Sequence, residues 1–148
     1  MTITWPGWCS LHMPDGWVHE DDTETISIFR QQDGVGALQL SFVRRIGLEL
    51  HASEAGATLA KSYAKQRGWL LDDDSIRITI VDRSFCAEFE YVELGDDSTY
   101  WQVWHIVDST RLVFATYLCA PSYAGIECEE RKAIIASLRW QAGTGRGG

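Results

Sequence analysis

Residues 100–107, YWQVWHIV, carry the strongest indication of the fold. Side chains alternate between the two faces of a β-strand, so Trp101 and His105 share one face while Trp104 and Ile106 share the other. Each face therefore carries large, mainly apolar side chains. A strand with this pattern lies centrally in a sheet that is covered on both sides. The stretch predicts a layered protein in which helices pack on a sheet.

Further strands surround this stretch and are separated from it by turn signals. Residues 76–80 and 85–93 alternate between apolar and polar side chains, and residues 112–119 are apolar on both faces. The short polar segments 95–97 (GDD) and 108–110 (DST) supply turns between them. Four strands at such short spacing predict an antiparallel meander.

The N-terminal part of the chain predicts three more strands. A short strand is expected around Leu11 and Met13. Residues 25–30 and 37–43 alternate in the same way and are joined by a connection that contains Asp-Gly, which predicts a hairpin. The acidic residues 20–22 (EDD) are expected to form a bend that faces water.

Two segments have the period of a helix. In residues 51–68, apolar side chains recur at every fourth position and form one stripe. Ser53 is expected to cap the first turn, and Gly68 is expected to close the helix in a left-handed conformation. A second helix is expected over residues 127–138.

The order of these elements predicts an α+β fold. We expect a single antiparallel sheet of about six or seven strands with two helices packed on it, in the order βββ-α-ββββ-α. Residues 1–142 are expected to form one domain, followed by a flexible glycine-rich tail at 143–148. A chain of 148 residues buries enough surface to build a core without disulfides or metals.

Composition limits the partners of the chain. The formal net charge is -8, and nucleic acids and anionic membranes attract basic surfaces, so neither is an expected partner. The acidic balance suits a basic protein partner, but the simpler and favoured interpretation is that net negative charge keeps a small protein soluble. No apolar run is long enough to span a membrane, and no signal peptide is recognised at the N-terminus, so we expect a cytoplasmic protein. The four cysteines form no CxxC pair and are expected to be free thiols.

The polar residues are not spaced for catalysis or metal binding. The four histidines form no HxH or HxxxH pair, and no GxSxG motif or phosphate-binding glycine loop occurs. His19 lies near Asp21 and Asp22, but a solvated loop is the favoured interpretation. We therefore expect no catalytic residue, no metal, no cofactor and no enzymatic activity.

Seven tryptophans are the unusual feature of the composition. Tryptophan is enriched where proteins bind one another, because it offers a large rigid surface with one polar group. Trp17, Trp104 and Trp140 are expected in the core, and any of the others could instead seal the ends of the sheet. The expected binding residues are Trp101, His105, Tyr100, Trp5, Trp8 and Trp69.

Three stretches resemble the PsbP-like superfamily, and specifically its small DcrB-like bacterial domains. Residues 11–17 (LHMPDGW) are similar to the strand and Pro-x-Gly-Trp motif that open the family's domain. Residues 36–41 (GALQLS) resemble its third strand, and residues 136–140 (ASLRW) resemble its closing helix. Together with the element order, the resemblance covers nearly the whole chain.

The resemblance implies a protein that binds or assembles other proteins and catalyses no reaction. Similar bacterial domains include Eag-type chaperones, and others of this kind act as immunity proteins to secreted toxins. We therefore expect a cytoplasmic immunity protein or chaperone for a secreted toxin or effector, with an aromatic sheet face around Trp101 and His105 as its contact surface. A fold alone does not determine a function.

Two alternatives stay open. The first is a small-molecule carrier or enzyme, which would be favoured by a deep apolar pocket between sheet and helix that holds His105 within hydrogen-bond reach of a carboxylate. The second is a self-assembling subunit that uses the same aromatic side chains as the face of a homodimer.

Overall fold

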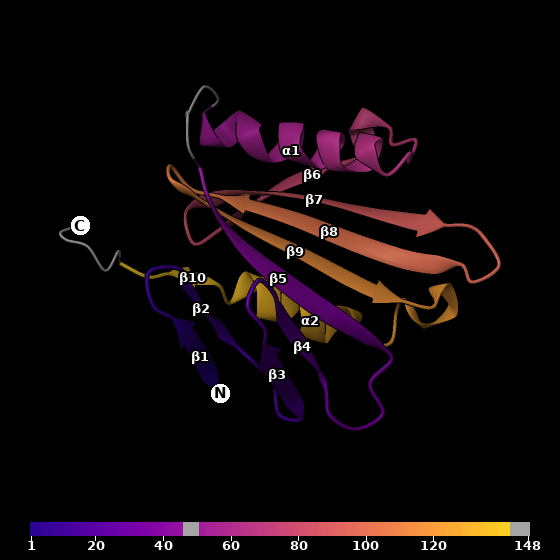
Figure 1. Cartoon of the computed structure of the whole chain (residues 1–148), viewed down its shortest axis with the longest axis horizontal. Coiled ribbons are helices and arrows are strands. Elements are labelled where there is room, and N and C mark those ends of the chain that lie inside the picture. The colour runs from indigo at the N-terminus through magenta and orange to yellow at the C-terminus, as the bar shows by residue number, and fades with distance from the viewer. Residues whose placement is uncertain (46–50, 143–148) are drawn as a thin grey trace.

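The structure is a computed structural model that describes residues 1–45 and 51–142. Within these residues, five strands precede the first helix and four follow it, and a second helix and a short strand come last (Figure 1). The strands are β1 (Thr2–Trp5), β2 (Cys9–His12), β3 (Trp17–Asp21), β4 (Ile26–Arg30), β5 (Gly36–Arg44), β6 (Arg77–Val81), β7 (Ser84–Glu93), β8 (Thr99–Val107), β9 (Arg111–Cys119) and β10 (Arg139–Trp140). The helices are α1 (Ala52–Gln66) and α2 (Cys128–Ala136), with two 3-10 turns at Asp73–Ser75 and Pro121–Tyr123.

Seven of the described strands form one antiparallel sheet in the order β3-β4-β5-β9-β8-β7-β6. Strand β8 pairs with β7 and β9 along its length, and every residue from 100 to 107 is buried. The interior position expected of this strand is therefore confirmed. So are the α+β class, the two helices and the four-strand meander from β6 to β9.

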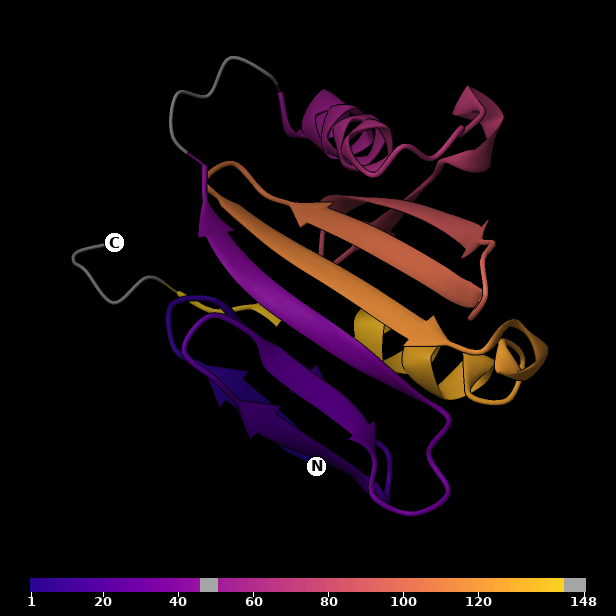
Figure 2. The same ribbon diagram turned by 45° about the vertical axis from the view of Figure 1, so that its right-hand side comes forward.

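Different layers cover the two faces of the large sheet (Figure 2). Helix α1 packs on one face, where Ala60 and Ala64 meet Phe89 and Val103. Helix α2 and the strands β1 and β2 lie on the other face. The core there contains side chains from β2 and α2 and from β4, β5, β8 and β9 of the large sheet. No helix in the described part of the chain is long and apolar enough to cross a membrane.

A second, three-stranded sheet with the order β1-β2-β10 was not expected from the sequence. Strand β10 has two residues, Arg139 and Trp140, which pair with Ser10 and Cys9 at the start of the chain. A strand this short has no periodicity to detect. Its existence depends on a contact between the two ends of the chain, which sequence patterns do not reveal.

The acidic residues after Trp17 form a strand where a bend was expected. Strand β3 runs to Asp21, because Glu20 and Asp21 pair with Ser27 and Ile26 of β4. This strand is at the edge of the large sheet. Charged side chains are common on edge strands, where they discourage pairing with other chains.

The residue expected to close α1 is confirmed, and the residue expected to cap its first turn is wrong. Gly68 has φ +74°, and the N–H of Trp69 donates to the carbonyl of Ala64, so the helix closes as expected. Ser53 is not the N-cap. His51 holds that position, and its carbonyl accepts the N–H groups of the first turn, including that of Ala55 at 2.9 Å. The expected tail at 143–148 lies outside the described residues.

Candidate functional site

The structure distributes the expected binding residues over separate places. Trp69, Trp101, His105 and Tyr100 are all buried, so the exposed aromatic face expected around Trp101 and His105 does not exist in this fold. Helix α1 covers that face, because its small side chains allow it to lie close to β7 and β8. Of the six expected binding residues, only Trp5 and Trp8 are half-buried, and these two lie together.

Trp69 and Trp101 belong to a closed cluster beneath the end of α1. Their ring centroids are 5.1 Å apart, and both indole N–H groups donate to Glu93, at 3.2 and 3.4 Å. The Arg67 guanidinium carbon lies 4.3 Å from the Trp101 ring centroid and covers it from outside. These polar groups satisfy one another, which favours a stabilising role for the two tryptophans.

Tyr100 lies on the opposite face of the sheet, in a buried polar network centred on Arg131 of α2. The Tyr100 hydroxyl donates to Glu90 and accepts from Arg131 at 3.2 Å. Arg131 Nε donates to Gln102 at 2.6 Å, and its guanidinium carbon lies 4.3 Å from the Tyr117 ring centroid. Burial and the bond to Glu90 raise the pKa of Tyr100. The network ties α2 to the sheet.

A surface groove of about 680 Å³ lies beside the β1–β2 turn. The β1–β2 turn forms one wall with Trp5 and Trp8. The connection at residues 21–25 forms the second, and residues 40–43 of β5 form the third. The groove therefore contains two of the expected binding residues together with an acidic loop.

Stacked aromatic rings form one side of this groove. The rings of Trp8 and Phe42 are stacked, with centroids 5.2 Å apart, and Trp5 meets Phe42 edge-on at 5.9 Å. The Arg44 guanidinium carbon lies 4.8 Å from the Trp8 ring centroid. A guanidinium is attracted to an aromatic face by the electrostatic field of the ring. Arg44 and Phe42 therefore already contact the Trp8 ring, and a partner's cation would compete with Arg44 for it.

Carboxylates form another side of the groove. Asp21, Asp22 and Glu24 are exposed there, and the described lining includes no Lys, Arg or His. Asp21 accepts the Trp5 indole N–H at 3.2 Å, and its other oxygen lies 2.7 Å from His19 Nδ1. The hydrogen bond with His19 is the main cause that lowers the pKa of Asp21, which keeps this carboxylate ionised.

A tight turn sets the spacing of the two tryptophans. The N–H of Trp8 donates to the carbonyl of Trp5 at 3.0 Å, and Gly7 between them has φ +81°. Proline followed by a residue of positive φ is the pattern of a type II turn, so Pro6-Gly7 is its sequence signature. The Trp-Pro-Gly-Trp sequence is therefore the signal that brings Trp5 and Trp8 to neighbouring positions.

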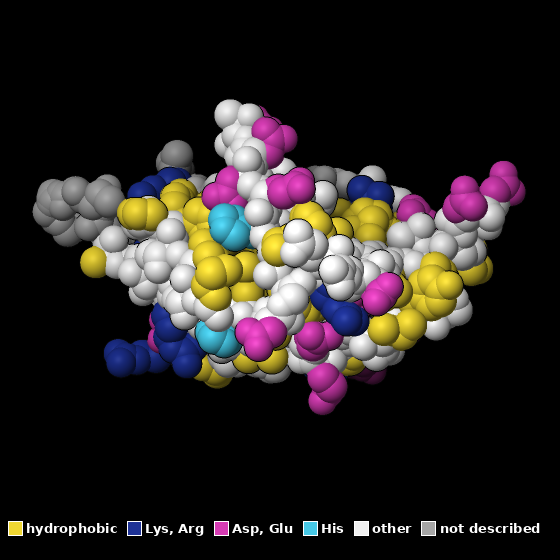
Figure 3. All heavy atoms as spheres, turned by 90° about the horizontal axis from the view of Figure 1, so that it is seen from below, with side chains coloured by type: hydrophobic (Ala, Val, Ile, Leu, Met, Phe, Trp, Pro, Cys, Tyr) yellow, Lys and Arg dark blue, Asp and Glu magenta, His cyan; other side chains and the backbone are white. Residues whose placement is uncertain are grey.

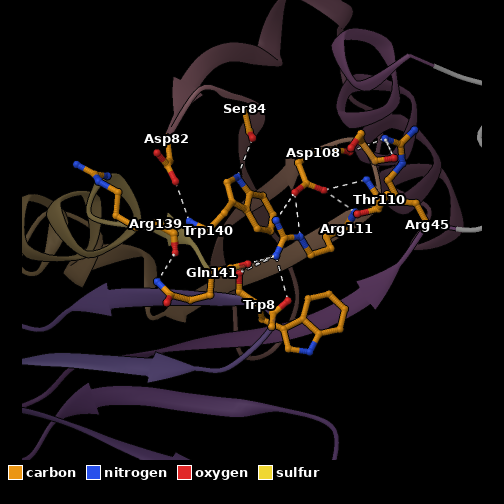
Figure 4. A network of polar contacts seen from close by, with 12 residues as sticks. Trp8, Arg45, Asp82, Ser84, Asp108, Thr110, Arg111, Arg139, Trp140 and Gln141 are labelled. Atoms are coloured by element: carbon orange, nitrogen blue, oxygen red, sulfur yellow. Dashed lines mark hydrogen bonds and ion pairs between the residues drawn. The ribbon is translucent and has the colours of Figure 1, made fainter. Parts of the chain in front are cut away.

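Arg111 fixes this turn to the rest of the protein (Figure 4). One guanidinium nitrogen donates to the carbonyls of Gly7 and Gln141, at 3.0 and 2.6 Å, and another lies 2.7 Å from Asp108. The Gln141 N–H in turn donates to the carbonyl of Trp8 at 2.9 Å. Arg111 of β9 and Gln141 after β10 therefore hold the turn, so the aromatic side of the groove is preorganised.

The surface around the N-terminal strands has the same mixed character. Figure 3 views the molecule from the side of β1, β3 and α2, and shows hydrophobic patches bordered by Asp and Glu side chains.

Among the described residues, the pair of His19 and Asp21 has no third side chain nearby that could complete a metal site. Within residues 1–45 and 51–142, no three His, Cys, Asp or Glu side chains gather as metal ligands would.

Comparison with known proteins gives similarity of fold only. No family model matches the sequence, and no curated protein matches it significantly. A crystal structure from Bacteroides thetaiotaomicron VPI-5482 aligns with a TM-score of 0.70 at 14% identity, over 95% of this chain and 48% of that one. The chain thus spans about half the length of the Bacteroides protein.

A second solved structure has the same fold over nearly its whole length. The cyanobacterial PsbP protein (CyanoP) of Synechocystis sp. PCC 6803 aligns with a TM-score of 0.63 at 11% identity. The alignment covers 90% of this chain and 87% of CyanoP, so it extends over nearly all of both proteins. The chain therefore has a PsbP-like fold.

Proposed function

We propose that the chain is a non-enzymatic protein-binding domain, and that its groove receives a basic segment of a partner protein. The observation that carries this proposal is the combination of aromatic rings and carboxylates in one preorganised hollow. Aromatic faces attract Lys and Arg side chains, and Asp22 and Glu24 can pair with the same charges. The net charge of -8 would speed the encounter with a basic partner.

The biological role we propose is that of an immunity protein or chaperone for a secreted bacterial toxin or effector. It is supported by the resemblance to DcrB-like and Eag-type domains and by the acidic surface. We place this activity in the cytoplasm. The support for that setting is that Cys9, Cys86, Cys119 and Cys128 are all free thiols, as is usual in a reducing compartment.

Capture of the partner with matched variants tests the groove. Replacing Trp8 by Ala removes a central aromatic contact, and we expect it to weaken binding about thirtyfold or more. Glu24→Lys should weaken binding about tenfold at low salt, mainly by slowing association. Glu24 is exposed and is part of the groove wall, so its replacement leaves the aromatic rings in place. The measurement is capture from cells of the source organism, followed by affinity determination for the captured protein.

Asp96→Lys is the control, because it changes the net charge equally at an exposed site in the turn after β7. A protein that is retained by Asp96→Lys and lost by both groove variants supports the proposal. Equal capture by all of them would refute it. Light scattering of the purified chain tests whether the groove binds a second copy of the chain instead of a partner. In that case the wild type would be a homodimer and Trp8→Ala would be a monomer.

A further inference from the structure

A smaller cleft of about 220 Å³ lies between α1 and the large sheet. Two residues of β5, Ser41 and Val43, line both this cleft and the groove, but the aromatic rings of the groove do not line the cleft. Leu59 and Tyr63 of α1 line one side, and Leu112 and Phe114 of β9 line the other. His105 of β8 lies between them. A water molecule occupies about 30 Å³ in the liquid, so the cleft has room for one small ring-containing molecule.

The imidazole of His105 is the unusual group in this cleft. The residue is 3% exposed, and its Nδ1 atom has no hydrogen-bond partner in the described part of the chain. Its ring lies 4.9 Å from Phe114 and 6.3 Å from Tyr63, measured between centroids. Buried polar atoms are nearly always paired in native proteins. Nδ1 is itself enclosed, but His105 lines the cleft, so a rotation of its imidazole would offer the unpaired nitrogen to a partner that the cleft receives.

The cleft is electrically neutral. None of its described lining residues is Asp, Glu, Lys or Arg, and its other polar groups are Ser41, Ser62 and Gln66. Burial lowers the pKa of His105 to about 4, so its imidazole is uncharged at neutral pH. A charged ligand would lose its hydration here and meet no opposite charge.

We propose that this cleft binds a small, neutral, single-ring molecule of the phenol class, whose ring packs against Tyr63 and Phe114 and whose hydroxyl bonds to His105. A hydroxyl both donates and accepts, so it satisfies the imidazole in either tautomer. Aromatic rings pack favourably edge-on or offset against one another, and Tyr63 and Phe114, with centroids 5.0 Å apart, already do so. The missing carboxylate beside His105 argues for binding rather than acid–base catalysis.

Titration of the full chain with p-cresol, followed by the NMR signals of the His105 imidazole, tests this proposal. We expect saturable shifts with a dissociation constant of about 1 mM or tighter, which is the order that a ligand of this size reaches. Toluene has the same shape and no hydroxyl, so it should bind about tenfold more weakly. Ser62 is an exposed residue of α1 that lines the cleft, and Ser62→Trp should abolish the shifts.

Ser53→Trp is the matched control, since Ser53 is also exposed on α1 and does not line the cleft. Shifts that survive in Ser53→Trp and disappear in Ser62→Trp support the site. Absence of any His105 shift with p-cresol, or equal binding of toluene, would overturn it. The groove variants Trp8→Ala and Glu24→Lys are expected to bind p-cresol normally, so failure of one proposal does not decide the other.

Discussion

Replacement of Arg131 by Ala is expected to lower the free energy of unfolding by about 3–5 kcal/mol. Arg131 is 1% exposed and connects α2 to Gln102 and Tyr100 of β8. Its removal leaves the Gln102 side-chain oxygen without its donor, takes away one of the two partners of the Tyr100 hydroxyl, and opens a cavity against Tyr117. Urea denaturation of the purified variant at neutral pH measures the loss.

Lys132 supplies the control for this effect, because it follows Arg131 on the same helix and is exposed. Lys132→Ala should change the unfolding free energy by no more than about 0.5 kcal/mol. A loss at Arg131 as small as that at Lys132 would show that the network does not hold α2 on the sheet. Arg131→Lys should recover part of the lost stability, since it restores the charge without the planar fork.

Acidification is expected to destabilise the protein through His105. Burial lowers the folded-state pKa from 6.5 to about 4, so between these values the unfolded chain binds a proton that the folded chain does not. This contribution to stability is complete above the unfolded pKa and is lost as the pH falls through the folded pKa. The difference corresponds to about 3 kcal/mol.

Comparison with His105→Phe isolates this contribution. We expect the wild type to lose about 3 kcal/mol more unfolding free energy than the variant between about pH 7 and about pH 4. The rings in contact with His105 are those of Tyr63 and Phe114, and burial raises the pKa of Tyr63 away from this range. Parallel pH profiles of the two proteins would show that His105 does not titrate as its burial predicts.

The interior of the fold was predictable because its strands are long and periodic. Residues 100–107 are apolar on both faces, and the structure buries all of them. Helix α1 has a regular apolar stripe and a closing glycine, and its extent was found almost correctly. Patterns of this kind extend over several residues and depend on local geometry, which a sequence records directly.

The candidate site was only partly predictable. A strand that is apolar on both faces is covered on both faces, so its aromatic residues are buried and not available for binding. Trp101 and His105 were expected at a contact surface, but α1 covers their face of β8. Trp5 and Trp8 were expected as binding residues, yet their neighbours Asp21 and Phe42 come from distant strands. Only the packing of β1, β3 and β5 at one end of the sheets brings these groups into a groove.

Binding of a cationic segment in the groove can be measured by titrating the chain with tri-arginine amide and following the indole N–H signals of its tryptophans. We expect the Trp5 and Trp8 signals to shift in a saturable way that weakens with salt, because the cation binds beside their rings and close to Asp22 and Glu24. The signals of Trp69 and Trp101, enclosed with Glu93, should not move. Shifts confined to other tryptophans, or equal shifts with tri-glutamate, would contradict the assignment of the groove as the binding site.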